Sequence, residues 1–441
     1  MTRRGAEALL ALLFVPAILV VGGAALFFFL TITPVHTDPA TVPSSTAIAQ
    51  RGRYSDAIEH ARRMARTIAA DEKLPGLSVA VAVDGEMIWA EAFGWADIER
   101  REPATPRARF RLGSVSKTLT AAAVGVLHER GRVDLDAPVQ TYLRAYPRKK
   151  WTVTTRQLMG DVAGVHVIRG DNNDSLPDRE CTSLDEAMTT VAREPLLFEP
   201  GTHYRFSTNG WILVSAVVES AAGEPFAAFM TRNVLTPLGM DSTVLEADEK
   251  LPDTTSFYFP RAGLNTKWGV EEAAWRNNSC LFGAGAYLST PSDLARFGSA
   301  MLKPGFLTAE TIALLQTPLR LDSGVSTDFA LGWKVEGVQL NGESTRMVAH
   351  RARPMGGTAA LLMFPDHKLV IAATSNVTEA TGVAPFSVKV AEAFTTRASR
   401  STAAVRTAPP RSGLGTAVES PRANQQNKPV ADGRCDQCGE R

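Results

Sequence analysis

The chain has 441 residues, which allows one large domain or two ordinary ones. Hydrophobic residues make up 44% and charged residues 21%, close to the usage of globular proteins, so we expect a sizeable buried core. The formal net charge of +1 provides no basic field for nucleic acid, and a small-molecule or peptide substrate fits this charge balance better.

The N-terminus carries an apolar stretch. No charged residue occurs from Ala8 to Ile32, and a helix of that length spans a ~30 Å hydrocarbon layer. Arg3 and Arg4 precede the stretch and almost no basic residue follows it, so the positive-inside rule keeps the N-terminus in the cytosol. We predict a membrane anchor in residues 1–32 of a single-pass protein whose folded domain lies outside the cytosol, in a bacterial periplasm. A cleaved signal peptide is the alternative.

The next segments predict a linker and then the start of a folded domain. Residues 33–54 are rich in Pro, Thr and Ser, which is typical of a linker. From residue 55 to about Ala70 the apolar positions repeat with a helical period. The pair Asp84-Gly85 then separates two β-prone runs, which predicts a tight hairpin.

Helices are predicted in the middle of the chain, each with a recognisable cap or boundary residue. They cover residues 118–130, residues 210–222 and a stretch that begins at Thr290-Pro291. Near the C-terminus two β-prone runs, 358–364 and 369–375, are predicted to pair before a last helix at about 385–394. We predict one α/β (α+β) domain over residues 55–396, in which both chain ends form one sheet around an inserted, mainly helical region.

The end of the chain has a different composition. Pro, Ser, Arg, Gln and Asn dominate residues 397–441, which we predict to be disordered. Cys435 and Cys438 form a lone Cys-x-x-Cys there, whereas a zinc site needs about four ligands, so we expect no metal and no cofactor. Cys181 and Cys280 lie inside the folded region, where a disulfide and two separate buried thiols are both open.

The sharpest motif is Phe110-Arg-Leu-Gly-Ser114-Val-Ser-Lys117-Thr, at the start of a predicted helix. Positions three apart share a helix face, so Ser114 and Lys117 can come within hydrogen-bond reach. A serine hydroxyl is a poor nucleophile unless a base takes its proton, and a lysine is such a base when desolvation lowers its pKa. The helix N-terminus offers N–H groups to an oxyanion. The alternative is Ser114 as an ordinary N-cap beside an exposed Lys117.

This motif resembles the Ser-x-x-Lys signature of β-lactamases and penicillin-binding proteins, and further segments resemble class C β-lactamase-like proteins in the same order. These segments are the hairpin from Leu77 to Asp97, Glu199-Pro-Gly-Thr-His-Tyr-Arg-Phe206-Ser-Thr-Asn-Gly210, Gly283-Ala-Gly285-Ala-Tyr-Leu-Ser-Thr, and a run beginning at His350. The resemblance spans roughly Ser55 to Phe394 and is greatest to the mitochondrial serine β-lactamase-like group and its bacterial relatives. It implies the β-lactamase/transpeptidase-like fold.

The resemblance also implies site residues. Ser114 is the nucleophile, Lys117 is its base, and His350 is the polar group of the third family element. The backbone N–H groups of Ser114 and Arg353 are the expected oxyanion donors. Thr208 stands where the family has Asn and keeps a hydroxyl.

Two positions depart from the family pattern. Phe206 occupies the place of a proton-shuttling Tyr, and a phenyl ring transfers no proton. Tyr204, two residues earlier, either substitutes for that phenol or packs elsewhere. Ala352 adds a methyl group where the family has Gly.

These residues lead to two functional hypotheses. We predict a serine hydrolase that acts through an acyl-enzyme on a β-lactam, a D-amino-acid peptide or a small ester. The alternative is a catalytically impaired member that binds or scaffolds at the membrane, because Phe206 and Ala352 both depart from the pattern. The sequence sets no oligomeric state.

Overall fold

A computed structural model of the chain describes residues 14–24, 26, 35–166, 180–246, 251–261, 265–273 and 277–406. By internal contacts the chain divides into Met1–Arg397 and Ala398–Arg441. Most of the second unit, including Cys435 and Cys438, lies outside the described residues.

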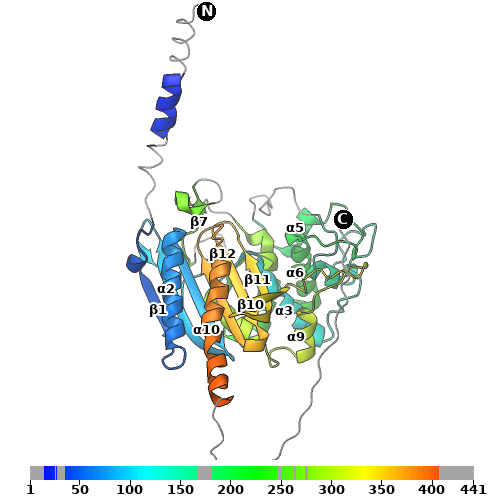
Figure 1. Cartoon of the computed structure of the whole chain (residues 1–441). Helices are drawn as coiled ribbons and strands as arrows, with labels where there is room; N and C mark the ends of the chain where they lie inside the picture. The colour runs from blue at the N-terminus through cyan, green and yellow to red at the C-terminus, as the bar shows by residue number, and fades with distance from the viewer. Residues whose placement is uncertain are drawn as a thin grey trace, which may run out of the picture. The chain divides into compact units, whose positions relative to one another are not determined.

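One antiparallel sheet of eight strands organises the domain, with the strand order β1-β3-β2-β13-β12-β11-β10 and β4 paired to β3 (Figure 1). The strands are β1 (Ser44–Ala49), β2 (Gly76–Val83), β3 (Glu86–Asp97), β4 (Glu102–Pro103), β10 (Lys334–Leu340), β11 (Glu343–Ala352), β12 (Thr358–Phe364) and β13 (Leu369–Ser375). β2 from the first part of the chain pairs with β13 from the last part, in the register Leu77–Ser375. The predicted closure of one sheet by both chain ends is therefore confirmed.

The hairpin between β2 and β3 forms at the predicted turn. Asp84 and Gly85 have φ angles of 53° and 87°, the left-handed conformations that a tight two-residue hairpin turn requires. Alternate residues of β2 then face opposite sides of the sheet. Val79 and Val81 join a core with α2 (Ser55–Asp71) and α10 (Val383–Arg406), which lie over one face in Figure 1.

The second face of the sheet is covered by helices of the inserted region. Ala80 and Ala82 join a core with α3 (Ser116–Glu129) and α8 (Pro291–Ala300). The other helices of this region are α4 (Thr155–Met159), α5 (Leu184–Val191), α6 (Thr208–Ala222), α7 (Phe226–Met230) and α9 (Ala309–Leu315). The predicted caps are confirmed, because Gly223 ends α6 at φ 72° and the Thr290 side chain accepts from the Asp293 N–H.

Two small sheets complete the strands. They are β5 (Phe110–Arg111), β9 (Tyr287–Ser289) and β6 (Val244–Leu245), in the order β5-β9-β6, and the pair β7 (Tyr258–Pro260) with β8 (Val270–Glu272). The first of these sheets matters for the site, because β5 leads directly into the segment that carries Ser114.

Part of the predicted linker, residues 44–49, forms a strand. His36 is 4% exposed, and Lys73 Nζ donates to its carbonyl oxygen at 2.8 Å. β1 lies within residues 33–54 and pairs with β3, so this segment belongs to the sheet. The run Ser-Ser-Thr-Ala-Ile-Ala supplies Thr and Ile, which suit a half-buried edge strand, and the Pro and Thr residues around it hid that signal. α10 also continues beyond residue 396, the predicted end of the domain.

Most of the predicted anchor lies outside the described residues. Within it, Phe14–Ala24 form a short apolar helix. In the part of the chain that the structure describes, no single helix is long and apolar enough to cross a bilayer. α6 and the following Phe226–Leu238 reach the required length and apolar composition only as a pair, with a bend of 78° between them. α6 is almost entirely buried in the domain. The anchor in residues 1–32 therefore stays a prediction.

Candidate active site

A cleft with a volume of about 590 Å³ lies beside the helix that begins after Ser114. One wall comes from the helical region, where Ser114, Phe206 and Thr208 line the cleft. The sheet contributes Ala352 and Arg353 at the end of β11. The cleft therefore brings together three stretches on which the family resemblance rests: the one with Ser114, the one with Phe206 and Thr208, and the one that follows His350.

Ser114 is positioned by a short strand and a glycine. β5 pairs with β9, and the Leu112 N–H continues this pairing by donating to the Tyr287 carbonyl at 2.9 Å. Gly113 then turns the chain with a φ of 51°, and a Cβ there would lie 2.8 Å from the Pro354 ring. Only glycine fits both the conformation and the space. Ser114 follows in the 3-10 turn η2 (Gly113–Val115) that opens α3.

Lys117 lies one turn into the same helical stretch and is fully buried. Its Nζ lies 2.6 Å from Ser114 Oγ, 3.3 Å from Thr208 Oγ1 and 3.1 Å from the Ala284 carbonyl oxygen. The exposed lysine of the alternative reading is therefore wrong. Burial disfavours the charged form of an amine, and the three oxygens fix the direction of its hydrogen bonds.

Phe206 lies over Lys117, at the position where the family pattern has a proton-shuttling Tyr. The Lys117 Nζ is 4.5 Å from the centroid of the ring, which also lines the cleft and is 38% exposed. The ring supplies a cation–π contact but no hydroxyl.

Tyr204 does not take over the missing phenol. Its ring stacks on Phe329 with centroids 4.7 Å apart, and it is not among the residues that line the cleft. Burial, with the nearby Asp161 charge, raises the pKa of Tyr204 and keeps its hydroxyl protonated. Packing against Phe329 therefore favours the second of the two alternatives, in which Tyr204 packs elsewhere.

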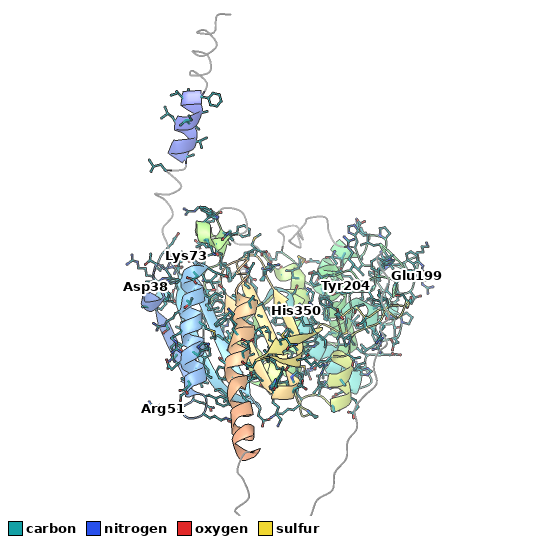
Figure 2. The ribbon with its side chains drawn as sticks, viewed as in Figure 1. Asp38, Arg51, Lys73, Glu199, Tyr204 and His350 are labelled. Carbon is teal, nitrogen blue, oxygen red and sulfur yellow. A yellow bond between two sulfur atoms is a disulfide. The ribbon has the colours of Figure 1, made fainter. Side chains whose placement is uncertain are left out.

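His350 lies on β11 (Figure 2) and is 7% exposed. Its Nδ1 lies 2.8 Å from the Gly332 carbonyl oxygen, which only accepts, so a neutral ring carries its proton on Nδ1. Burial is the main cause that lowers the pKa of His350 to about 4. His350 is not among the described residues that line the cleft, and its catalytic role stays a prediction.

At the C-terminal end of β11, the strand edge next to the cleft is not paired with β10. β10 pairs with β11 only as far as the couple Lys334–Ala349, whereas Arg351, Ala352 and Arg353 line the cleft. Arg353, directly after the strand, carries its guanidinium to Glu379 with Nη1 and Oε2 2.6 Å apart. The Arg353 side chain is thus engaged elsewhere, and its contribution to an oxyanion would come from the backbone.

A disulfide joins Cys181 to Cys280, which settles the two alternatives left by the sequence. Cys280 belongs to the 3-10 segment η7 (Ser279–Ala284) and lines the cleft. The same segment ends at Ala284, whose carbonyl accepts from Lys117. The disulfide therefore ties the segment that orients Lys117 to the chain before α5.

The family model described as Beta-lactamase matches residues 61–387. The chain belongs to the beta-lactamase family. It is similar to the mitochondrial serine beta-lactamase-like protein LACTB of Mus musculus, with 28% identity over 415 residues, 72% of this chain and 74% of that protein. Penicillin-binding protein 4* of Bacillus subtilis (strain 168) is 24% identical over 344 residues, 76% of this chain and 75% of that protein.

A solved structure shows the same fold. The D-amino acid amidase from Ochrobactrum anthropi SV3 superimposes with a TM-score of 0.65 at 21% identity, over 78% of this chain and 100% of that one. The predicted fold and the predicted membership of the β-lactamase and penicillin-binding-protein superfamily of serine hydrolases are therefore confirmed.

The sequence did not predict some of the residues that line the cleft. The Ala284 carbonyl lay inside a segment already compared with the family, but a backbone acceptor has no side-chain signature. Glu379 lines the cleft from a turn after β13, with a φ of 60°, and no motif marked it. Arg351 pairs with Glu336 on the neighbouring strand, a contact that only the register of β10 and β11 creates.

Proposed function

We propose that the domain is a serine hydrolase that works through an acyl-enzyme, with Ser114 as nucleophile and Lys117 as general base. The contact that carries this proposal is the 2.6 Å distance between Lys117 Nζ and Ser114 Oγ beside the cleft. A nucleophile within hydrogen-bond reach of a base that is itself held by other groups is the arrangement that covalent catalysis needs.

Hydrogen-bond counting supports Lys117 as the base. A neutral amine has two N–H donors and one lone pair. The Ala284 carbonyl only accepts, and the Thr208 hydroxyl can accept as well, so these two oxygens take both donors. The lone pair then faces Ser114, whose O–H donates to it. The proton moves to Lys117 as Oγ attacks the substrate carbonyl.

The remaining steps follow from the same contacts. As the tetrahedral intermediate collapses, the bond to the leaving group breaks and Lys117 returns the proton to that group. The N–H groups of Ser114 and Arg353 hold the oxyanion, because Gly113 and Pro354 bring η2 and the end of β11 into contact. Water then attacks the acyl carbonyl and gives its proton to Lys117, which passes it to Ser114 Oγ as the bond between Oγ and the acyl carbon breaks.

The substrate is proposed to be a small ester, a D-amino-acid peptide or amide, or a β-lactam. The D-amino acid amidase and the penicillin-binding protein among its relatives support these classes. The charged side chains that line the cleft are Arg351, Arg353 and Glu379, and each arginine has an acidic partner.

A second candidate is a member that acylates and fails to turn over. Phe206 motivates it, because the ring over Lys117 has no hydroxyl and Tyr204 is stacked on Phe329. Such a protein would bind or trap its ligand and act as a scaffold at the membrane.

One experiment separates these candidates. The full chain is treated with a fluorophosphonate probe and with penicillin, and the intact mass is followed over time beside Ser114→Ala. We expect a single adduct on the wild type that Ser114→Ala does not form. An unmodified wild type would refute the nucleophile, whereas a penicillin adduct that never clears would favour the impaired member.

The domain is proposed to lie outside the cytosol, tethered by residues 1–32. The Cys181–Cys280 disulfide supports this placement, because disulfides persist in oxidising compartments. A periplasm-active reporter fused after Ser45 is expected to be active, and activity of a cytosolic reporter at the same position would reverse the topology.

A further inference from the structure

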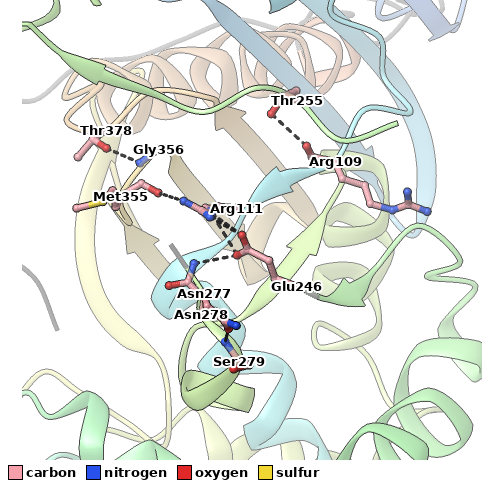
Figure 3. Close-up of polar contacts among 10 residues, drawn as sticks. All are labelled: Arg109, Arg111, Glu246, Thr255, Asn277, Asn278, Ser279, Met355, Gly356 and Thr378. Atoms are coloured by element: carbon pink, nitrogen blue, oxygen red, sulfur yellow. Dashed lines mark hydrogen bonds and ion pairs between the residues drawn. The ribbon is translucent and has the colours of Figure 1, made fainter. Parts of the chain in front are cut away.

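Arg111 lies three residues before Ser114 in β5, and its side chain is 2% exposed. Its guanidinium bonds to two different segments at once (Figure 3). Nε lies 3.0 and 3.1 Å from the two carboxylate oxygens of Glu246, with Nη2 on the same group, and Nη1 donates to the Met355 carbonyl at 2.9 Å. The guanidinium also packs 4.0 Å from the centroid of Phe257. A planar fork of five donors is suited to such divided bonding, and a lysine ammonium is not.

One of the two segments bonded to Arg111 is the loop at residues 353–357, which begins with Arg353 and contains Met355. Gly357 packs on Arg111 so closely that an added Cβ would lie 3.1 Å from the Arg111 Cβ. On its other side the loop is held by Thr378, whose Oγ1 accepts from the Gly356 N–H at 2.6 Å and donates to the Pro354 carbonyl at 3.2 Å. Arg111 and Thr378 therefore fix the loop from two sides.

The other segment bonded to Arg111 carries Glu246, which connects Arg111 to Asn278 in the wall of the cleft. Glu246 also accepts from Asn278 Nδ2 at 2.9 Å, and its backbone N–H donates to the Ala286 carbonyl at 2.8 Å. Asn278 and Ala286 flank the segment that contains Ala284, the acceptor of Lys117. One buried ion pair thus links the loop after β11, the strand before Ser114 and the segment that orients the base.

We propose that Arg111 is a positioning residue, which sets the Arg353 N–H at the distance from Ser114 that the oxyanion requires. The inference rests on the proposed function, in which these two N–H groups hold the oxyanion. Such donors act only within about 2.7–3.1 Å of the oxyanion, and loss of one lowers kcat by about 10²–10³-fold. A loop that shifts by a fraction of an ångström therefore slows the reaction while the reactants still bind.

The test measures how fast a fluorophosphonate labels the full chain. Ser114 Oγ attacks phosphorus, a P–O bond forms, the P–F bond breaks, fluoride leaves and the serine proton passes to Lys117, while the phosphoryl oxygen occupies the oxyanion site. Arg111→Lys keeps the positive charge beside Glu246 but cannot hold both partners. We expect kinact to fall by about 10- to 100-fold with KI within about twofold of the wild type.

Arg109→Lys is the matched control. Arg109 lies two residues earlier on the same chain segment, and its guanidinium bonds to the Ser242 and Pro252 carbonyls instead of the loop. We expect its labelling rate to stay within about twofold of the wild type, since a lysine there still leaves the loop and Glu246 untouched.

Thr378 provides an independent pair of variants on the other side of the loop. Thr378→Val removes the hydroxyl that bonds Gly356 and Pro354 and is expected to lower kinact. Thr378→Ser keeps this hydroxyl and is expected to label at the wild-type rate. Arg111→Lys and Thr378→Val labelling at the wild-type rate would overturn the positioning role alone. An equal loss in Arg109→Lys and Thr378→Ser would overturn it in favour of general destabilisation. A wild type that never labels would overturn the proposed function instead.

Discussion

The buried imidazole of His350 makes stability depend on pH in a calculable way. Its pKa falls from 6.5 to about 4 in the folded chain, so the unfolded state binds a proton in this interval that the folded state does not. The stabilisation is complete above about pH 6.5 and is lost as the pH falls toward 4. At 1.36 kcal/mol per pKa unit, protonation of this group in the unfolded chain lowers the free energy of unfolding by about 2–3 kcal/mol as the pH falls from 6.5 to between 4.5 and 4.

The assay compares urea unfolding of the wild type with that of His350→Gln at pH 8 and pH 4.5. Gln keeps an N–H that can donate to the Gly332 carbonyl but does not titrate. The wild type is expected to lose about 2–3 kcal/mol more than the variant between these two pH values. An equal loss in both proteins would show that His350 is not a buried neutral group in the folded chain.

Three further changes test other parts of the site. Phe206→Tyr places a phenol beside Lys117, and we expect faster hydrolysis of p-nitrophenyl butyrate by about 100-fold, whereas an unchanged rate would refute a proton-transfer role for a phenol at this position. Replacing both Cys181 and Cys280 by Ala is expected to lower the free energy of unfolding by about 2–4 kcal/mol in denaturant titrations, and an unchanged midpoint would deny the disulfide. Gly283→Ala puts a Cβ 2.2 Å from Thr120 Oγ1, so its melting temperature is expected to fall, whereas Gly337→Ala meets open space and serves as the control.

The parts of the fold that the sequence predicted correctly depend on local chemistry. Asp84-Gly85 and Gly223 need left-handed backbone, and Thr290-Pro291 opens a helix, so each carries its own signal. The Ser114 and Lys117 pair is also local, because three positions on a helical turn suffice to bring the side chains together.

The features that were missed depend on contacts between distant segments. Arg111 and Glu246 are 135 positions apart, and nothing near either residue indicates the other. Tyr204 has the right chemistry and nearly the right position, but Phe329, from a distant loop, decides where its ring lies. β1 was missed because its partner β3 supplies the pairing that its own composition only weakly favours.

The loss of the phenol bears more on the second half of the reaction than on the first. Acylation needs a base on Ser114 Oγ, and Lys117 lies 2.6 Å from that atom. Deacylation needs a base for water that approaches the acyl carbon after Ser114 has become an ester oxygen. Phe206 offers only a ring to that water, and the Thr208 hydroxyl lies 3.3 Å from Lys117 Nζ. A burst of acylation followed by slow turnover is therefore the kinetic pattern that this geometry favours, and the steady rate after the burst measures how much of the water-activating chemistry Lys117 and Thr208 retain.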